Sequence, residues 1–333
     1  MKRPLPTQTG FALIPPPKVF SYLDAALSLP FESRAEAFSA VNASWLADIS
    51  LLTYEAADRQ AQVLRGAGFS HVLHVDGTEN GCHGVIAGND ACVVIAFRGT
   101  RIKSFRDVVT DAQMAPSPEP GLGHVHSGFR KSLNEVWDTA VQHLRRPELD
   151  CGPGAARRLW LTGHSLGGAL ATLAAARLPH AAGLYTFGCP KVGDVEFHRE
   201  FNRRNVATNT FRFVHARDAV VHLPPSLAPG LKQKLLSFGA DKLLAALDRA
   251  QYEHVGSARY IDRQGSLLTD APEWKDIREH YLRRIENLVG RVKVFKEGLK
   301  LDADFFRIDE VDDHAPIFYA THLFNALRDE RGG

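Results

Sequence analysis

The feature that most constrains this chain is the pentapeptide Gly-His-Ser-Leu-Gly at residues 163–167. The apolar residues before it, ending at Thr162, predict a buried parallel strand, and the alanine- and leucine-rich residues 166–178 predict a helix packed against that strand. A serine between two glycines at such a junction is typical of a nucleophile elbow, a strained turn that projects one hydroxyl above a sheet. The pentapeptide also arises by chance, but its strand and helix context favours Ser165 as a nucleophile.

Length and charge narrow the remaining possibilities. A chain of 333 residues can bury one large core, and we predict an N-terminal arm at residues 1–34 followed by a single α/β domain at residues 35–333. Its 40 Lys and Arg nearly balance its 38 Asp and Glu, so no nucleic-acid partner is expected. No stretch is long and apolar enough for a transmembrane segment or a secretory signal. We therefore expect a cytoplasmic protein, with signal-independent export as the alternative.

Cysteine and histidine spacing argues against a disulfide framework and against a metal site. The four cysteines are predicted to be free thiols, and none has the spacing of a metal ligand. His124 and His126 alternate, but without a third ligand nearby they are more typical of a strand or loop. We predict neither a bound metal nor a cofactor.

Short apolar runs separated by Gly, Asn and Asp predict antiparallel strands between residues 71 and 97, after two helices at residues 35–52 and 57–64. The last of these strands leads into Arg98-Gly99-Thr100, a position suited either to an oxyanion donor or to an ordinary turn. Asp218 follows another predicted parallel strand, where an acid that orients an imidazole belongs, although a lone Asp there is also a common turn residue.

Taken together, these segments resemble a known family, the class 3 lipases, over roughly residues 40–225. The motifs that carry the resemblance, in chain order, are Arg98-Gly99-Thr100, His126-x-Gly128-Phe129, Gly163-x-Ser165-x-Gly167, Thr186-Phe187-Gly188 and Asp218 ahead of Leu223-Pro224. The resemblance implies an α/β-hydrolase fold, with a mostly parallel central sheet flanked by helices. It also implies hydrolysis of ester bonds in acylglycerols or related lipids through an acyl-enzyme.

The same resemblance implies roles for particular residues. Ser165 would be the nucleophile and Asp218 the acid, and the oxyanion hole would use Thr100 and the backbone N–H of Leu166. Residues 101–113 would form a lid that contacts a lipid interface, although Val108 stands where the family often has an aromatic residue. Activity as a phospholipase or short-chain carboxylesterase is the alternative, and a non-catalytic binding protein is less favoured because the strained turn is intact.

The base must lie beyond Asp218, which leaves five histidines: His222, His254, His280, His314 and His322. His314 stands in an Asp-Asp-His-Ala-Pro segment ahead of an aromatic helix, which resembles the histidine loop of bacterial class 3 lipases. His254 is the second candidate, because its surroundings resemble a family segment that precedes the histidine. We predict His314.

The chain departs from the family pattern after Pro225. Residues of about 226–251 are predicted to form a helical insertion, with apolar residues on one face of a helix at residues 231–250. Packing of that helix against the core is favoured over a role as a second cap or an interfacial helix.

Overall fold

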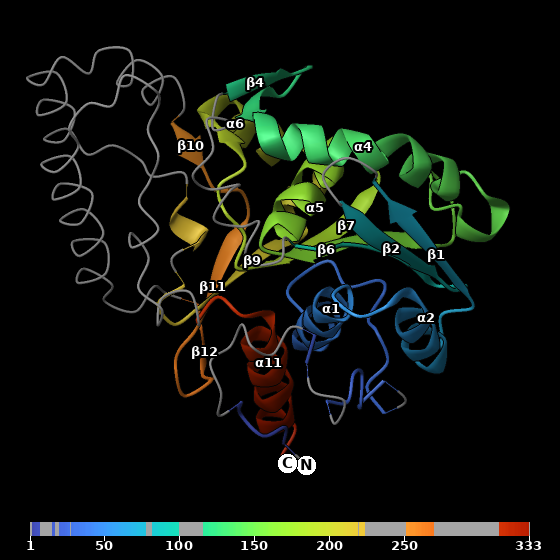
Figure 1. Ribbon diagram of the computed structural model, residues 1–333, viewed down its shortest axis with the longest axis vertical. Helices are drawn as coiled ribbons and strands as arrows, with labels where there is room; N and C mark the ends of the chain where they lie inside the picture. Colours follow the sequence, from blue (N-terminus) through green and yellow to red (C-terminus); the bar gives the residue numbers. More distant parts are fainter. Residues whose placement is uncertain are drawn as a thin grey trace, which may run out of the picture.

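The centre of the molecule is an eight-stranded sheet in the order β1-β2-β3-β6-β7-β9-β11-β12 (Figure 1). In the computed structural model the described residues are 2–6, 15–16, 20–26, 28–77, 82–99, 116–218, 220–223, 251–269 and 313–332. The strands are β1 (His71–Asp76), β2 (His83–Gly88), β3 (Cys92–Phe97), β6 (Arg158–His164), β7 (Ala181–Phe187), β9 (Thr210–His215), β11 (Ser257–Ile261) and β12 (Leu267–Leu268).

Strands β3, β6, β7, β9 and β11 are parallel, whereas β1, β2 and β12 join the two edges in antiparallel pairs. A smaller four-stranded sheet has the order β10-β8-β5-β4. Its strands are β10 (Tyr252–Glu253), β8 (Gly193–Asp194), β5 (Gly123–His126) and β4 (Pro116–Glu119). The predicted arrangement, a mostly parallel central sheet flanked by helices, is therefore present.

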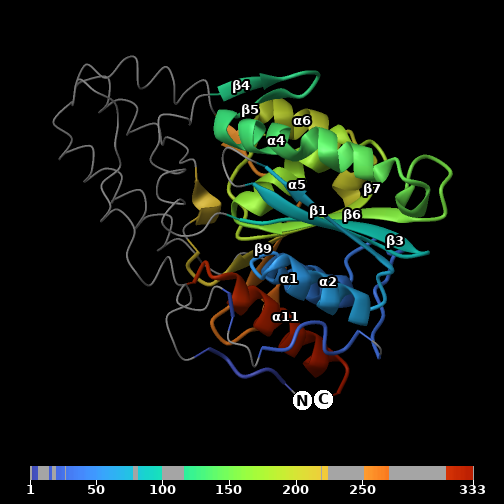
Figure 2. The same ribbon diagram turned by 45° about the vertical axis from the view of Figure 1, so that its right-hand side comes forward.

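Helices cover both faces of the large sheet (Figures 1 and 2). One face carries α1 (Ala40–Leu52), α2 (Ala57–Gly66) and α11 (Pro316–Glu330), and the other carries α4 (Ser127–Leu144), α5 (Leu166–Arg177) and α6 (Val195–Asn202). Side chains of β3 alternate between two apolar cores: Val93 and Ile95 pack with α4 and α5, and Val94 packs with α1 and α11. A strand buried on both faces needs a continuous apolar run, which explains the β3 sequence.

Side-chain hydrogen bonds determine two local features of the fold. The first helix begins at Ala40 rather than Ala35, because the Ser39 hydroxyl caps it by accepting the Asn42 N–H. In the turn between β2 and β3, Asn89 Oδ1 accepts the backbone N–H groups of Ala91 and Cys92. All four cysteines are buried and free, as predicted.

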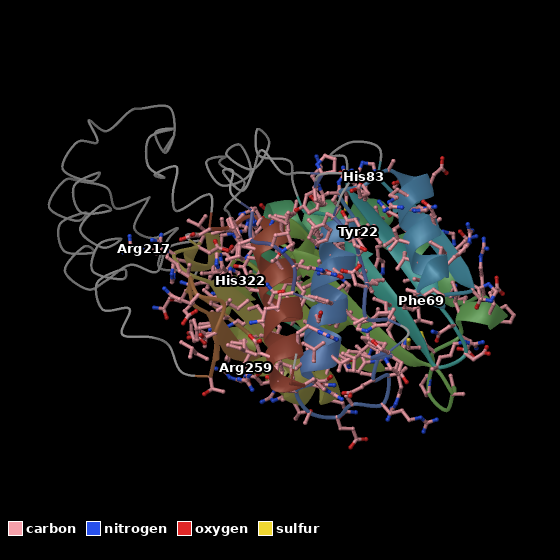
Figure 3. The ribbon with its side chains drawn as sticks, turned by 90° about the horizontal axis from the view of Figure 1, so that it is seen from below. Tyr22, Phe69, His83, Arg217, Arg259 and His322 are labelled. Carbon is pink, nitrogen blue, oxygen red and sulfur yellow. The ribbon has the colours of Figure 1, made fainter. Side chains whose placement is uncertain are left out.

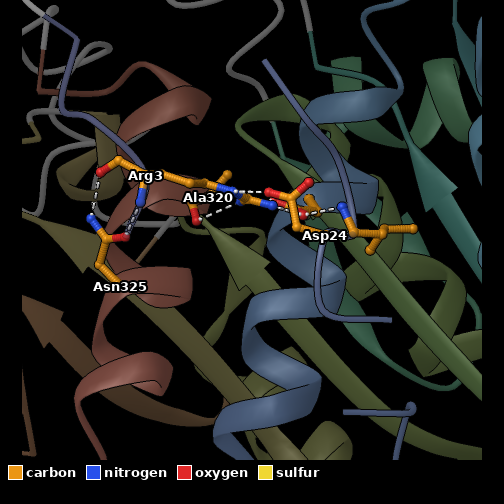
Figure 4. Close-up of polar contacts among 6 residues, drawn as sticks. Arg3, Asp24, Ala320 and Asn325 are labelled. Carbon is orange, nitrogen blue, oxygen red and sulfur yellow. Dashed lines mark hydrogen bonds and ion pairs between the residues drawn. The ribbon is translucent and has the colours of Figure 1, made fainter. Parts of the chain in front are cut away.

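The N-terminal arm is anchored by Arg3, which lies buried between α1 and α11. Arg3 binds both carboxylate oxygens of Asp48 at 2.6 Å, and its Nε lies 3.2 Å from Asp24. Its backbone exchanges two hydrogen bonds with the Asn325 side chain (Figure 4). Since Asp48 belongs to α1 and Asn325 to α11, the arm fastens together two helices that run side by side in Figure 3.

Three predictions concern residues outside the described part of the chain: the lid at residues 101–113, the oxyanion donor Thr100, and the helical insertion up to residue 250. Within the described part, no helix has the length and apolar character of a membrane span.

Candidate active site

Ser165 occupies a strained turn between β6 and α5. Its φ of 59° and ψ of −128° are unusual for a residue with a side chain, and such strain is concentrated at functional sites. Gly163 and Gly167 approach each other so closely that a Cβ on Gly163 would clash with the Gly167 backbone, and a Cβ on Gly167 would clash with the Phe97 carbonyl. The two glycines therefore let the helix start directly above the sheet, and the predicted elbow geometry is present.

Asp218 lies just past the end of β9 and is fully buried. Its Oδ2 lies 2.7 Å from His314 Nδ1 and accepts the Tyr319 hydroxyl at 2.6 Å, and its Oδ1 accepts the Val220 N–H at 2.8 Å. The carboxylate therefore accepts one hydrogen bond from its own loop and two from a segment about 100 residues away. Burial raises the pKa of Asp218, but His314, Tyr319 and Val220 outweigh this effect and leave the pKa below its ordinary value.

An ionised carboxylate only accepts hydrogen bonds, so His314 Nδ1 carries the proton in the bond to Asp218. In the neutral imidazole, Nε2 is then the proton acceptor. Gly188, with φ of 59°, makes room for this pair: a Cβ there would lie 2.7 Å from Asp218 Oδ2 and 2.8 Å from His314 Nδ1. The arrangement holds one imidazole tautomer in one orientation.

The turn that carries Ser165 lies close to the His314 imidazole. The His314 ring packs against His164, with ring centroids 4.5 Å apart, and His164 directly precedes Ser165. The Ser165 N–H donates to the Phe187 carbonyl at 2.9 Å, next to the glycine that contacts His314. Ser165 Oγ is buried and makes no hydrogen bond to any described residue. The structure therefore joins Asp218 to His314 and places His314 against the residue that precedes Ser165.

The other candidate histidines lie in different surroundings. His254 Nε2 bonds to the Val221 carbonyl at 2.7 Å, not to a carboxylate. His322 is buried in an aromatic cluster, where its ring stacks on those of His215 and Phe318. His222 is exposed in the short helical turn after Asp218, and His280 lies outside the described residues. The bond to Asp218 therefore separates His314 from His254 and His322.

Of the two predicted oxyanion donors, Leu166 belongs to the described residues and Thr100 does not. Leu166 is the first residue of α5, so its N–H belongs to the turn whose donors have no acceptor within the helix. The loop that precedes Thr100 lies nearby, because a Cβ on Gly99 would be 3.2 Å from the Cβ of Ser165. Across the described residues, no three His, Cys, Asp or Glu side chains are grouped to hold a metal ion.

Three residues around the site were not assigned a role from the sequence: Tyr319, His164 and Tyr54. Tyr319 contacts Asp218 from α11, one helical turn beyond His314, and the spacing of an aromatic five residues after the histidine was its only signal. His164 and Tyr54 share a hydrogen bond of 2.9 Å across 110 residues of sequence, which no local pattern indicates.

Comparison with known proteins agrees with this geometry. Residues 94–228 match the family model of class 3 lipases. The chain is 33% identical to a lipase of Caenorhabditis elegans over 162 residues, which cover 46% of this chain and 44% of the relative. It is 34% identical to the secreted mono- and diacylglycerol lipase A of Penicillium cyclopium over 142 residues, 40% of this chain and 44% of the relative. The predicted resemblance to class 3 lipases is confirmed, and the match spans less than half the length of these relatives.

The fold is also found in a solved structure. A mutant form of MDLA from Penicillium cyclopium aligns with 85% of this chain and 96% of its own, with a TM-score of 0.50 and 24% sequence identity. The predicted α/β-hydrolase fold is confirmed.

The prediction of a cytoplasmic protein is wrong. Relatives from Penicillium cyclopium and Fusarium solani are named secreted lipases. The prediction depended on the hydropathy of the first residues, and hydropathy there does not determine the compartment.

Proposed function

Because residues 94–228 match the class 3 lipases, we propose that this chain is a serine hydrolase that cleaves carboxylic ester bonds in lipids. The observation that carries the proposal is the buried Asp218–His314 pair beside a strained serine at a helix N-terminus. Acyl transfer by a serine requires a nucleophile, a base that accepts its proton and an acid that orients the base.

In the proposed mechanism, Ser165 Oγ attacks the ester carbonyl while His314 Nε2 takes the hydroxyl proton. Asp218 keeps Nδ1 protonated and stabilises the imidazolium that forms. The tetrahedral oxyanion receives the Leu166 N–H at the start of α5, where the helix dipole favours negative charge, with Thr100 as the second donor. His314 then gives its proton to the alcohol as the C–O bond breaks, leaving an acyl-enzyme.

Hydrolysis of the acyl-enzyme repeats these steps with water. His314 takes a proton from the water as it attacks, the second tetrahedral oxyanion uses the same donors, and the proton returns to Ser165 as the acid leaves. No further group is needed for the atoms and charges to balance.

As substrates we propose acylglycerols, supported by the mono- and diacylglycerol lipase among the relatives. We also propose that the protein acts outside the cell, as relatives named secreted do. Its four free thiols are compatible with this location, because burial raises the pKa of each to about 12 and lowers its reactivity. The lid at residues 101–113 stays a prediction.

A hydrolysis panel tests the proposal: aryl esters from acetyl to palmitoyl, mono- and diacylglycerols, and a phospholipid, each with Ser165→Ala as control. We expect turnover of the acylglycerols and aryl esters that disappears in Ser165→Ala. Turnover that survives the substitution would remove Ser165 from the mechanism, and preferential cleavage of the phospholipid would replace the substrate class.

A further inference from the structure

A continuous chain of hydrogen bonds connects the three segments that make up the site. The Gly99 N–H, in the loop before Thr100, bonds to the Tyr54 hydroxyl. That hydroxyl lies 2.9 Å from His164 Nδ1, and His164 Nε2 lies 2.6 Å from the backbone carbonyl of His314. Tyr54, His164 and His314 are all buried, with at most 5% of any of them exposed.

The direction of each bond follows from its partners. A carbonyl only accepts, so His164 Nε2 carries a proton and donates it to the His314 carbonyl. Burial and the neighbouring His314 hold the pKa of His164 well below its ordinary value, so the ring is neutral. His164 Nδ1 then carries no proton and accepts a hydrogen bond from the Tyr54 hydroxyl. The Tyr54 oxygen in turn accepts a hydrogen bond from the Gly99 N–H. Each donor in this series of hydrogen bonds therefore has one acceptor.

This series of hydrogen bonds holds His314 at a second position, its backbone carbonyl. Asp218 fixes the His314 ring through Nδ1, and His164 fixes the His314 backbone through its carbonyl. Because His164 is bonded covalently to Ser165, the backbone that carries the base is tied to the residue beside the nucleophile. A residue in a loop is held less rigidly than one in a helix or strand. A displacement of the base by about 1 Å would lower the rate by about 10²-fold.

We propose that His164, oriented by Tyr54, is a positioning residue that sets the distance between the nucleophile Ser165 and the base His314. The inference rests on the proposed function and concerns a residue other than Ser165, Asp218 and His314. Neither His164 nor Tyr54 touches the reacting atoms in this account, so their effect is on geometry and hence on turnover.

The test measures rate per intact site, which separates positioning from loss of folded protein. An alkyl fluorophosphonate, left to react to completion, counts functional Ser165 sites, and p-nitrophenyl butyrate then gives kcat per counted site and KM. The variants are His164→Phe, which keeps a ring but no hydrogen bonds, His164→Gln, which restores a donor, and Tyr54→Phe, which removes one hydroxyl. The matched control is Tyr22→Phe, since the Tyr22 hydroxyl bonds only to Glu55 among the described residues.

We expect kcat per site to fall about 10- to 100-fold in His164→Phe, with KM changed by less than about twofold, because the substitution misplaces the base without altering substrate contacts. His164→Gln should recover at least about half of that loss on a logarithmic scale, and Tyr54→Phe should lower kcat by about 3- to 10-fold. Tyr22→Phe should match the wild type per site.

The inference is overturned if His164→Phe and Tyr54→Phe both turn over within twofold of the wild type per site, or if His164→Gln is no better than His164→Phe. If His164→Phe does not fold, Tyr54→Phe against Tyr22→Phe decides the question alone. A wild-type protein that neither hydrolyses the ester nor binds the fluorophosphonate would refute the proposed function instead, so the two failures are distinct.

Discussion

Removing the Tyr319 hydroxyl by Tyr319→Phe should destabilise the protein in a manner that depends on the charge of Asp218. Burial and the nearby Asp218 raise the pKa of Tyr319 well above its ordinary value, so the hydroxyl stays protonated and donates to Asp218 at 2.6 Å. It also accepts the His215 N–H at 3.1 Å. A hydrogen bond to a charged group contributes about 1.5–3 kcal/mol, and with the His215 N–H left unpaired we expect the free energy of unfolding at pH 7 to fall by about 2–4 kcal/mol.

The pH dependence identifies the source of this loss. The folded pKa of Asp218 is below its ordinary value of about 3.9, so its stabilisation is fully present above that pH and is lost as the pH falls through the folded pKa. Tyr319→Phe removes one of the groups that lower this pKa. The difference in unfolding free energy between wild type and variant should therefore shrink as the pH falls from 7 to 3.

Urea denaturation across this range provides the measurement, and Tyr185→Phe is the matched control. The buried Tyr185 hydroxyl accepts the Ser39 N–H, a neutral partner, so its loss of about 0.5–1.5 kcal/mol should not vary with pH in this way. A Tyr319→Phe effect that is equally large at pH 3 and pH 7 would refute the view that Tyr319 stabilises an ionised Asp218.

Three other perturbations probe the arm, the space beside the site and the thiols. Arg3→Met leaves Asp48 buried without its cation and should lower the unfolding free energy by about 3–5 kcal/mol; a change under 1 kcal/mol in urea denaturation would show that the pair is unimportant. Gly188→Ala places a Cβ 2.7 Å from Asp218 and should reduce kcat at least about 10²-fold, whereas an unchanged kcat would mean that the pair tolerates displacement. The four thiols should react with Ellman's reagent only after unfolding, because burial raises each pKa to about 12; rapid labelling of native protein would contradict this.

The parts of the site that the sequence predicted are those with a local chemical signature. The glycines around Ser165 form a short sequence motif, and Asp218 is marked by the end of its strand. His314 lacks such a signature: it lies 96 residues from Asp218, and only the family resemblance separated it from four other histidines. Its second attachment, through His164, connects residues 150 positions apart and has no local trace.

The features of the fold that the sequence did not predict have the same origin. Apolar spacing from Phe38 onward suggested an earlier helix start, and the competing hydrogen bond from Ser39 decided where α1 begins. The arm at residues 1–34 was predicted without its anchor, because Arg3 is buried by Asp48 and Asn325, which are far away in the sequence. Tertiary partners of this kind are determined only when the helices pack.

The turnover of His314→Ala beside that of His254→Ala tests the central claim most directly. Both substitutions remove a buried imidazole that donates a hydrogen bond, to Asp218 from His314 and to the Val221 carbonyl from His254. With both proteins folded and p-nitrophenyl butyrate as substrate, His314→Ala should lose at least about 10³-fold in kcat, as expected for a member of a catalytic triad, while His254→Ala stays within about tenfold of the wild type. Near-wild-type turnover in His314→Ala with collapse in His254→Ala would contradict the assignment of the base.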